Sequence, residues 1–220
     1  LQQSFRYFNE PRQTVGVEFF PGGINELAVP GEEMSYTLDV FNRSETLTDT
    51  FTLSISGAAW PSSLLTQTLT LGPCAMTQTV LTLNVPTGLP ADLVEELTVT
   101  AVSHNNPSVS AQLPVVHKIP GHILFVDDDR FYDQTAEFTA ALDDMDLTYD
   151  RWDTGHAGSV RNGPSLALLQ NYDFVIWYTG YDWFQPITPA ENQALTGYLA
   201  QGGRLFLTSQ DFLYYHHQTE

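Results

Sequence analysis

The sequence predicts two consecutive folding units, an all-β two-sheet sandwich followed by an α/β unit built on a parallel sheet. Two observations indicate this. Residues 14–116 form a series of short segments rich in Thr, Val and Leu that are separated by turn residues, which is typical of strands. Beyond residue 118, apolar segments alternate with helical patterns, as in βαβ units. We therefore expect the sandwich at residues 1–118 and the α/β unit at residues 119–220.

The strands of the sandwich are expected at residues 14–20, 34–41, 50–56, 66–71, 77–84, 96–103 and 109–116. Apolar and polar residues alternate most clearly around Tyr36, Leu38 and Val40, as on a strand with one buried face. Turn-forming Gly and Pro pairs lie between the segments, for example Gly72-Pro73. This many short strands in about a hundred residues favours a sandwich of immunoglobulin type.

The α/β unit is expected to begin with a strand at residues 122–126, because a continuous apolar run suits a parallel strand buried on both faces. Phe138, Leu142 and Met145 predict a helix over 133–145, with Asp133 as its N-cap. Further strands are expected at 147–152, 173–178 and 204–208, and a short helix at 165–170.

A last helix is predicted to start at Thr188, because a capping Thr, Pro189 and Glu191 form a capping box with Pro in the first turn. Its buried face is expected to consist of Ala194, Leu195, Tyr198 and Leu199, and Gly202-Gly203 to end it. Doubly wound sheets usually carry about five or more strands. With four expected strands, the α/β unit is predicted to be C-terminally incomplete.

The charge balance excludes two classes of partner. The chain carries 8 Lys and Arg against 26 Asp and Glu, a formal net charge of −18, so phosphate-rich surfaces are repelled. We therefore expect no nucleic-acid partner, and no apolar run approaches the roughly 20 residues that span a bilayer. Cys74 is the only cysteine, which excludes an intrachain disulfide and a cysteine-based metal site.

Three acids follow the first expected parallel strand. Asp127, Asp128 and Asp129 lie at the carboxyl edge of the sheet, where open α/β sheets bind their ligands. Clustered carboxylate oxygens suit Ca²⁺ or Mg²⁺, so these residues are the candidate metal ligands. The alternative is that Asp128 or Asp129 caps the following turn and the other acids are solvated.

Ser209 follows the fourth expected strand, where a nucleophile elbow would lie. Such elbows need small residues two positions away on both sides, as in Gly-x-Ser-x-Gly. Leu207 and Asp211 occupy these positions, so Ser209 is a weak catalytic candidate. The alternative is that it caps a helix.

Aromatic residues crowd the segment after the third parallel strand. Tyr181, Asp182 and Trp183 are candidate ligand-binding residues, because aromatic rings beside a carboxylate can stack on a sugar or a peptide. Tyr178 and Phe184 flank them. The alternative is that the rings close over a core.

The first unit resembles a known kind of module. Residues 30–103 start with Pro30-Gly31-Glu32, pass Asn42 and Trp60 and end a strand at Val85-Pro86. This layout resembles the immunoglobulin-like accessory modules of secreted bacterial glycosidases and peptidases. The resemblance implies architecture and an extracellular context rather than a chemistry.

The second unit resembles class I glutamine amidotransferase-like modules, which implies a flavodoxin-like three-layer fold around a parallel sheet. The shared layout comprises VDDD at 126–129, YDRW at 149–152 and the GGRL and SQD segments within 202–211. It is similar to the version found in subtilisin-like serine peptidases and immune-inhibitor-type metallopeptidases. True amidotransferases carry a cysteine in the region of Ser209 and Gln210, so the resemblance does not extend to glutaminase activity.

These features predict a non-catalytic accessory region of a secreted multidomain hydrolase, with a subtilisin-like serine peptidase as the expected parent. Its role would be spacing, binding or stabilisation, and its partners would be other domains of the same polypeptide and a protein or carbohydrate surface. The expected location is extracellular or on a bacterial cell surface. Two alternatives stay open. One is a stand-alone hydrolase using Ser209 or a metal at Asp127, Asp128 and Asp129, and the other is a cation-dependent carbohydrate-binding module.

Overall fold

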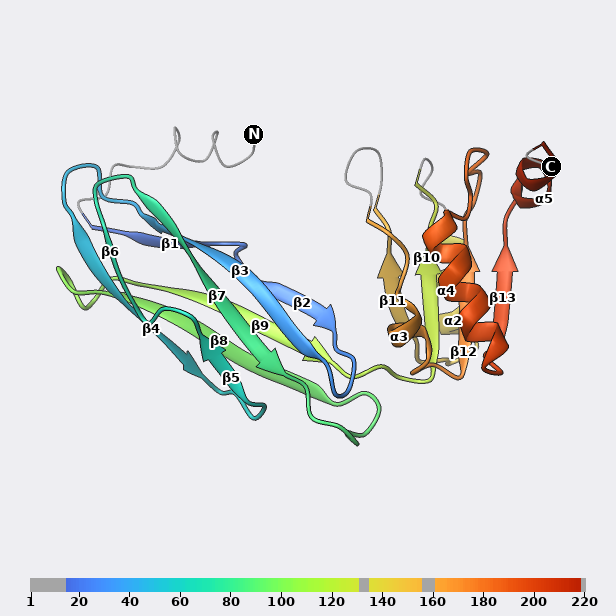
Figure 1. Cartoon of the computed structure of the whole chain (residues 1–220), viewed down its shortest axis with the longest axis horizontal. Helices are drawn as coiled ribbons and strands as arrows, with labels where there is room; N and C mark the ends of the chain where they lie inside the picture. The colour runs from blue at the N-terminus through green and yellow to red at the C-terminus, as the bar shows by residue number, and fades with distance from the viewer. Residues whose placement is uncertain (1–14, 131–134, 156–160, 219–220) are drawn as a thin grey trace. The chain divides into compact units, whose positions relative to one another are not determined.

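Two units make up the computed structural model, which describes residues 15–130, 135–155 and 161–218 (Figure 1). The first unit, the sandwich unit, extends to Leu89 and resumes over Leu93–Lys118. The second, the α/β unit, runs from Ile119 and includes the short segment Pro90–Asp92. The backbone N–H of Asp92 donates to the carbonyl of Ile119 at 3.2 Å, which ties this segment to the α/β unit.

The sandwich unit consists of two sheets. The first holds β1 (Val17–Phe20), β3 (Glu33–Asn42), β7 (Met76–Asn84) and β5 (Ser62–Leu64), in that order, and the second holds β2 (Ile24–Leu27), β9 (Ser110–Lys118), β8 (Val94–Ser103), β4 (Asp49–Ser56) and β6 (Thr68–Leu71). Neighbouring strands are antiparallel except for the parallel pair β2 and β9. Figure 1 shows the two sheets face to face.

A single hydrophobic core lies between these sheets. Leu38 and Val40 of β3 and Leu81 of β7 face it from one sheet, and Phe51 of β4 and Val99 of β8 face it from the other, all fully buried. Buried residues recur at every second position along these strands, as the alternating pattern predicts. The predicted two-sheet sandwich is thereby confirmed.

Each strand expected in the sandwich is present, but β2 and β5 were not predicted. The four residues of β2 include the exposed Asn25 and Glu26, and β5 has three residues, so neither contains enough alternation to be recognised. β9 also runs two residues further than expected, to Lys118. Residue 14, the expected start of the first strand, lies outside the described residues.

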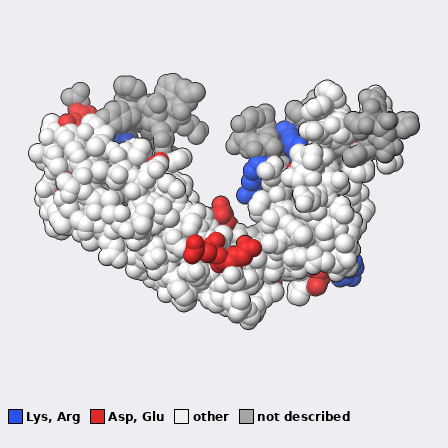
Figure 2. All heavy atoms as spheres, in the orientation of Figure 1, with Lys and Arg blue, Asp and Glu red and all other residues white. Residues whose placement is uncertain are grey.

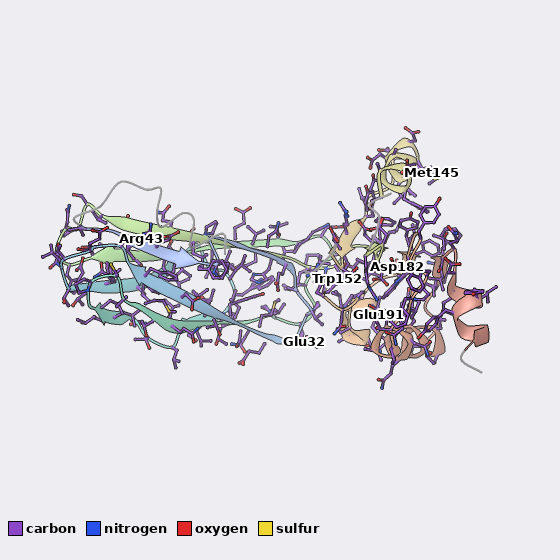
Figure 3. The ribbon with its side chains drawn as sticks, turned by 90° about the horizontal axis from the view of Figure 1, so that it is seen from above. Glu32, Arg43, Met145, Trp152, Asp182 and Glu191 are labelled. Atoms are coloured by element: carbon purple, nitrogen blue, oxygen red, sulfur yellow. The ribbon has the colours of Figure 1, made fainter. Side chains whose placement is uncertain are left out.

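The α/β unit is built on one sheet of four parallel strands. The strand order is β11 (Asp150–Asp153), β10 (Ile123–Asp127), β12 (Phe174–Tyr178) and β13 (Leu205–Thr208), and the helices are α2 (Thr135–Asp144), α3 (Leu166–Leu169), α4 (Pro189–Ala200) and α5 (Phe212–Gln218). Helices α3 and α4 cover one face of the sheet and α2 the other (Figures 1 and 3). Helix α5 was not predicted.

Helix α4 begins as its sequence predicts. The Glu191 N–H donates to the Thr188 hydroxyl at 3.3 Å, and the Thr188 N–H donates to Glu191 Oε2 at 2.7 Å, which completes the capping box. Ala194, Leu195 and Tyr198 are buried as expected. The prediction that Leu199 is buried is wrong, because its side chain is 47% exposed.

Helix α2 packs on the sheet through Phe138, whose ring lies 4.4 Å from that of Tyr178 and 6.0 Å from that of Phe125, centroid to centroid. Leu142 is buried as expected. Met145 is not part of the buried face, because the helix ends at Asp144 and the Met145 side chain is 60% exposed. Asp133, the expected N-cap, lies outside the described residues.

The chain is poor in charged residues, which make up 15% of its sequence. On the face drawn in Figure 2, most exposed atoms belong to residues that are neither acidic nor basic. Within the described part of the chain, no helix has the length and apolar character needed to cross a membrane.

Candidate functional site

The three segments that the sequence singles out lie side by side at the carboxyl edge of the parallel sheet, defined here as residues 127–130, 178–185 and 208–211. Backbone hydrogen bonds join them. The N–H of Asp128 donates to the carbonyl of Tyr178 at 2.8 Å, that of Thr179 to Thr208 at 3.1 Å, and that of Gln210 to Gly180 at 3.3 Å. The topology therefore assembles the candidate residues as expected for an open α/β sheet.

Asp127 points toward helix α2 and is 1% exposed. Its Oδ2 accepts hydrogen bonds from the Thr135 hydroxyl at 2.7 Å and from Arg151 Nη2. Its Oδ1 has no hydrogen-bond partner among the described residues. Among the described residues, the protein thus uses only one of the two oxygens of this carboxylate, Oδ2.

Asp128 points to the opposite face of the sheet and is fully buried. Its Oδ2 accepts from Trp177 Nε1 at 3.0 Å, and its Oδ1 accepts from the Thr154 hydroxyl at 3.0 Å and from Arg130 Nε at 3.1 Å. Consecutive residues of a strand face opposite sides, so Asp127 and Asp128 diverge. Neither carboxylate is solvated, so the alternative of solvated acids is excluded for Asp127 and Asp128.

Arg130 links Asp128 to Glu191, the capping residue of α4. Its Nη2 lies 3.0 Å from Asp128 Oδ1 and donates to both Glu191 oxygens at 3.0 Å. Glu191 is 1% exposed and also accepts from the backbone N–H of Gly163 at 2.9 Å. Figure 3 shows Glu191 and Asp182 in this part of the unit, away from Met145. We call Arg130, Asp128 and Glu191 the Arg130 network.

The Arg130 network contains one cation and two buried carboxylates. Burial, followed by repulsion from Glu191, raises the pKa of Asp128 to about 7, although Arg130, Trp177 and Thr154 oppose the rise. The two acids conversely raise the pKa of Arg130 against the effect of its own burial. Asp128 therefore titrates near neutral pH, far above the ordinary range of an aspartate.

Asp129 is 1% exposed and lies against the turn that follows β12. A Cβ placed on Gly180 would lie 3.0 Å from the Asp129 Cβ and 3.1 Å from the Tyr178 hydroxyl, so Gly180 allows this close approach. The pKa of Tyr178 is raised to about 12, first by burial and then by Asp129 and Asp127. Asp129 and Tyr178 thus share an acidic region on the α2 side.

The acidic triplet does not converge on one point. Among the described residues, no three or more His, Cys, Asp and Glu side chains are grouped so that they could hold a metal ion. The physical reason is that Asp127 and Asp128 diverge and each accepts hydrogen bonds from protein groups. Binding of Ca²⁺ or Mg²⁺ at Asp127, Asp128 and Asp129 stays a prediction.

The aromatic loop, residues 181–185, is the exposed part of this edge. Tyr181, Trp183 and Phe184 are 45%, 64% and 56% exposed, so their rings do not close over a core. The Trp183 and Phe184 ring centroids are 6.1 Å apart in an edge-to-face contact, and Tyr215 of α5 lies 5.9 Å from Phe184. Asp182 is only 1% exposed and interacts with Arg130, so it does not accompany the rings at the surface.

Ser209 lies directly after β13, as predicted, with its hydroxyl oxygen buried and without a hydrogen-bond partner in the described structure. A catalytic serine needs a base within hydrogen-bonding reach, and none contacts it there. His216 and His217 belong to α5, but their side chains lie outside the described part of the chain. The described residues supply Ser209 with no catalytic partner.

Two residues that hydrogen-bond Asp128 were not predicted as site residues, namely Arg130 and Trp177. Glu191 was predicted only as a capping residue. A sequence signal existed for Arg130, because it is one of 8 basic residues and directly follows the acidic triplet. Its position in a buried network depends on contacts between residues about 60 positions apart, which no local pattern contains.

A second buried polar cluster lies in the sandwich unit. His117 is fully buried, and its cross-strand neighbours are Glu26 on β2 and Glu95 on β8. The Tyr36 hydroxyl lies 2.7 Å from His117 Nε2 and donates to Glu26 at 3.1 Å, whereas Nδ1 has no hydrogen-bond partner among the described residues. Burial lowers the pKa of His117, and Glu26 and Glu95 only partly oppose this.

No family model matches the chain, and no curated protein matches it. Among solved structures, PapD-like domain 7 of human CEP192 is 16% identical, covering 51% of this chain and 90% of its own, with a TM-score of 0.39. SSP-19, an MSP-domain protein like family member of Caenorhabditis elegans, is 14% identical, covering 46% and 98%, with a TM-score of 0.35. A family 123 glycoside hydrolase from Clostridium perfringens is 10% identical, covering 89% and 49%, with a TM-score of 0.41. Likenesses this weak carry no argument about function.

Proposed function

We propose that this chain is a non-catalytic accessory region of a secreted multidomain hydrolase and that the aromatic loop of its α/β unit binds a protein or carbohydrate surface. The observation that carries the proposal is that the acidic groups at the carboxyl edge are buried, whereas the aromatic groups are exposed. Asp127, Asp128 and Asp182 are buried, and Trp183 and Phe184 are exposed. The edge therefore presents a contact surface rather than a set of reactive groups.

The fold proposed for the α/β unit is flavodoxin-like and glutamine amidotransferase-like. Numbered within the unit, its strand order β11-β10-β12-β13 is 2-1-3-4. Flavodoxin-like sheets have the same order over their first four strands. Together with the sequence layout at 126–129 and 202–211, this order supports the proposed relationship and, through it, a subtilisin-like serine peptidase as the parent.

The ligand class follows from the chemistry of the loop. Tyr181, Trp183 and Phe184 offer apolar ring faces, and Tyr and Trp add a polar tip. A sugar ring or an apolar peptide side chain can stack on such faces. A phosphate-rich ligand is disfavoured, because the chain carries 26 acids against 8 Lys and Arg.

Turnover assays test the non-catalytic part of the proposal. The isolated chain is expected to release no product from casein, a p-nitrophenyl ester or glutamine, and Ser209→Ala is expected to behave identically. Turnover that Ser209→Ala abolishes would establish the chain as a hydrolase in its own right and would overturn the proposal.

Binding assays test the aromatic loop. We expect the chain to bind members of a glycan array or immobilised protein substrates, and Trp183→Ala to reduce the affinity by about tenfold, as loss of a central aromatic contact does. Phe206→Ala is the matched control, because Phe206 is also aromatic and 52% exposed but lies on β13. Equal binding by both variants would contradict the role of the loop. Binding lost in EDTA and restored by Ca²⁺ would instead favour the cation-dependent carbohydrate-binding module.

A further inference from the structure

We propose that Arg130 is the positioning residue of the aromatic loop, joining the loop to the end of β10 and to helix α4. The inference rests on the proposed function, because the loop is the surface that would bind the ligand. Arg130 itself is only 12% exposed in its side chain, so it acts on the ligand through the loop.

The guanidinium group contacts three parts of the unit at once. Its Nη1 donates to the backbone carbonyl of Gln185, at the end of the loop, at 3.3 Å. Its Nη2 donates to Glu191 on α4 at 3.0 Å, and its Nε donates to Asp128 after β10 at 3.1 Å.

Arg130 interacts with both ends of the aromatic loop. At the start, the Asp182 N–H donates to the Thr179 carbonyl at 3.1 Å, and the buried Asp182 carboxylate interacts electrostatically with Arg130. At the end, Gln185 has a φ of 47°, a left-handed conformation that is unfavourable for a residue other than Gly. The Arg130 contact to the Gln185 carbonyl stabilises that conformation. Trp183 and Phe184 lie between these two contacts.

The chemistry of the site requires arginine rather than any cation. The hydrogen-bond acceptors named above are two carboxylates and one carbonyl, and they belong to three different segments of the unit. A guanidinium presents five N–H donors in a fixed planar arrangement, so it can bond all three together. A lysine ammonium is a single point of charge on a flexible stem. It can neutralise the carboxylates but cannot maintain the same three-way geometry.

The experiment uses the full chain without ligand and compares Arg130→Gln and Arg130→Lys with the native protein. Chymotrypsin cleavage after Tyr181, Trp183 and Phe184 measures the order of the loop. The fluorescence anisotropy of Trp183, obtained by subtracting a Trp183→Phe background, measures the mobility of that side chain. We expect cleavage to accelerate by about tenfold in both variants, because a locally released loop is cut through its open state. The anisotropy of Trp183 is expected to fall in parallel.

Tyr172→Phe is the matched control. It removes a buried hydrogen bond of the same unit, from the Tyr172 hydroxyl to Asp150 Oδ2 at 3.0 Å, at the opposite edge of the sheet. Its loop cleavage is expected to equal that of the native chain. The two variants are compared under conditions in which they have the same free energy of unfolding. If the loop of Arg130→Gln is then cut no faster than that of Tyr172→Phe, the proposal is wrong.

The lysine variant shows whether the loop needs the geometry of the guanidinium group or only its positive charge. It also keeps the test possible if Arg130→Gln does not fold. Faster loop cleavage in a folded Arg130→Lys chain supports the proposal, and full protection by lysine overturns it, because charge alone would then suffice. These measurements need no ligand. If Trp183→Ala leaves glycan and protein binding unchanged while Arg130→Lys releases the loop, the proposed function fails and the positioning role stands.

Discussion

At the scale of single residues, a buried polar side chain can join backbone segments that are far apart in the sequence. Asn42, 2% exposed at the end of β3, is the clearest case. Its Nδ2 donates to the carbonyls of Leu47 at 2.9 Å and of Leu71 and Gly72 at 3.0 Å, and its Oδ1 accepts from the Ser44 N–H at 2.9 Å. Asn42-Arg43-Ser44 matches a glycosylation sequon, but the acceptor nitrogen is enclosed by these bonds.

Asn42→Ala is expected to lower the free energy of unfolding of the sandwich unit by about 3 kcal/mol, because it leaves buried carbonyls unsatisfied. Asn25→Ala is the matched control, since Asn25 is exposed on β2 and should change the stability by less than about 0.5 kcal/mol. Urea unfolding followed by circular dichroism measures both. Similar losses in the two variants would show that the Asn42 bonds contribute nothing specific.

The candidate site shows at the same scale what the sequence can and cannot predict. The position of Asp127, Asp128 and Asp129 at the ligand-binding edge follows from local order, because they directly end an apolar strand. Their partners do not follow. Asp128 is satisfied by Trp177 and Arg130, and the Trp177 contact spans 49 residues of sequence. Burial and hydrogen bonding depend on packing across the unit. The sequence therefore predicted the location of these acids but not that they are buried or which groups they bond.

Elements with strong local determinants were predictable and short ones were not. The capping box at Thr188 and Glu191 and the stop at Gly202 are local chemistry, and α4 runs over Pro189–Ala200 as they indicate. Gly202 has a φ of 89°, the left-handed conformation that ends helices. β5 has too few residues to show a period. Helix α5 consists largely of aromatic and histidine residues, which are weak helix formers.

The junction of α4 and β13 depends on a glycine for space rather than for conformation. A Cβ on Gly203 would lie 2.5 Å from the ring of Tyr198, which is buried and donates to the carbonyl of Tyr172 at 3.1 Å. Gly203→Ala is therefore expected to destabilise the α/β unit by about 2 kcal/mol through overpacking. Thermal unfolding followed by the circular dichroism of the helices, which lie in the α/β unit in the described part of the chain, measures the loss.

Gly72→Ala is a control for a general effect of replacing glycine, because Gly72 lies in the sandwich unit and a Cβ there meets nothing within 4 Å. It is expected to leave the unfolding of the α/β unit unchanged. A Gly203→Ala protein whose α/β unit is as stable as that of the native chain would mean that the Tyr198 ring moves aside without cost.

At the scale of the whole molecule, each unit buries a titratable group with a shifted pKa, and the two shifts act on stability in opposite directions. His117 in the sandwich unit is fully buried beside Glu26 and Glu95, and its pKa is lowered from 6.5. Asp128 in the α/β unit has a pKa raised from 3.8 to about 7. A chain with few surface charges still acquires a specific pH response from such interior groups.

The expected pH dependence follows from which state binds the proton more tightly. As the pH falls, His117 binds its proton in the unfolded chain at a higher pH than in the folded chain. Its contribution to the stability of the sandwich unit is therefore complete above about pH 6.5 and is lost as the pH falls below that value. The folded chain protonates Asp128 while the unfolded chain has already released that proton, so the α/β unit loses stability as the pH rises from about 4 to 7. Each unit of pKa shift corresponds to roughly 1.4 kcal/mol.

Calorimetric melting tests the direction of both pH effects. It compares the native chain with His117→Gln and Asp128→Asn between about pH 4.5 and 8, in steps of about half a pH unit. The slope of stability with pH measures the difference in bound protons between the folded and the unfolded chain. Gln keeps a donor toward the Tyr36 hydroxyl without titrating, so His117→Gln is expected to remove part of the loss in Tm below pH 6.5. Asp128→Asn lowers the overall stability but is expected to remove the decline between pH 4.5 and 7. A variant whose Tm runs parallel to the native curve would show that its residue does not titrate in that window.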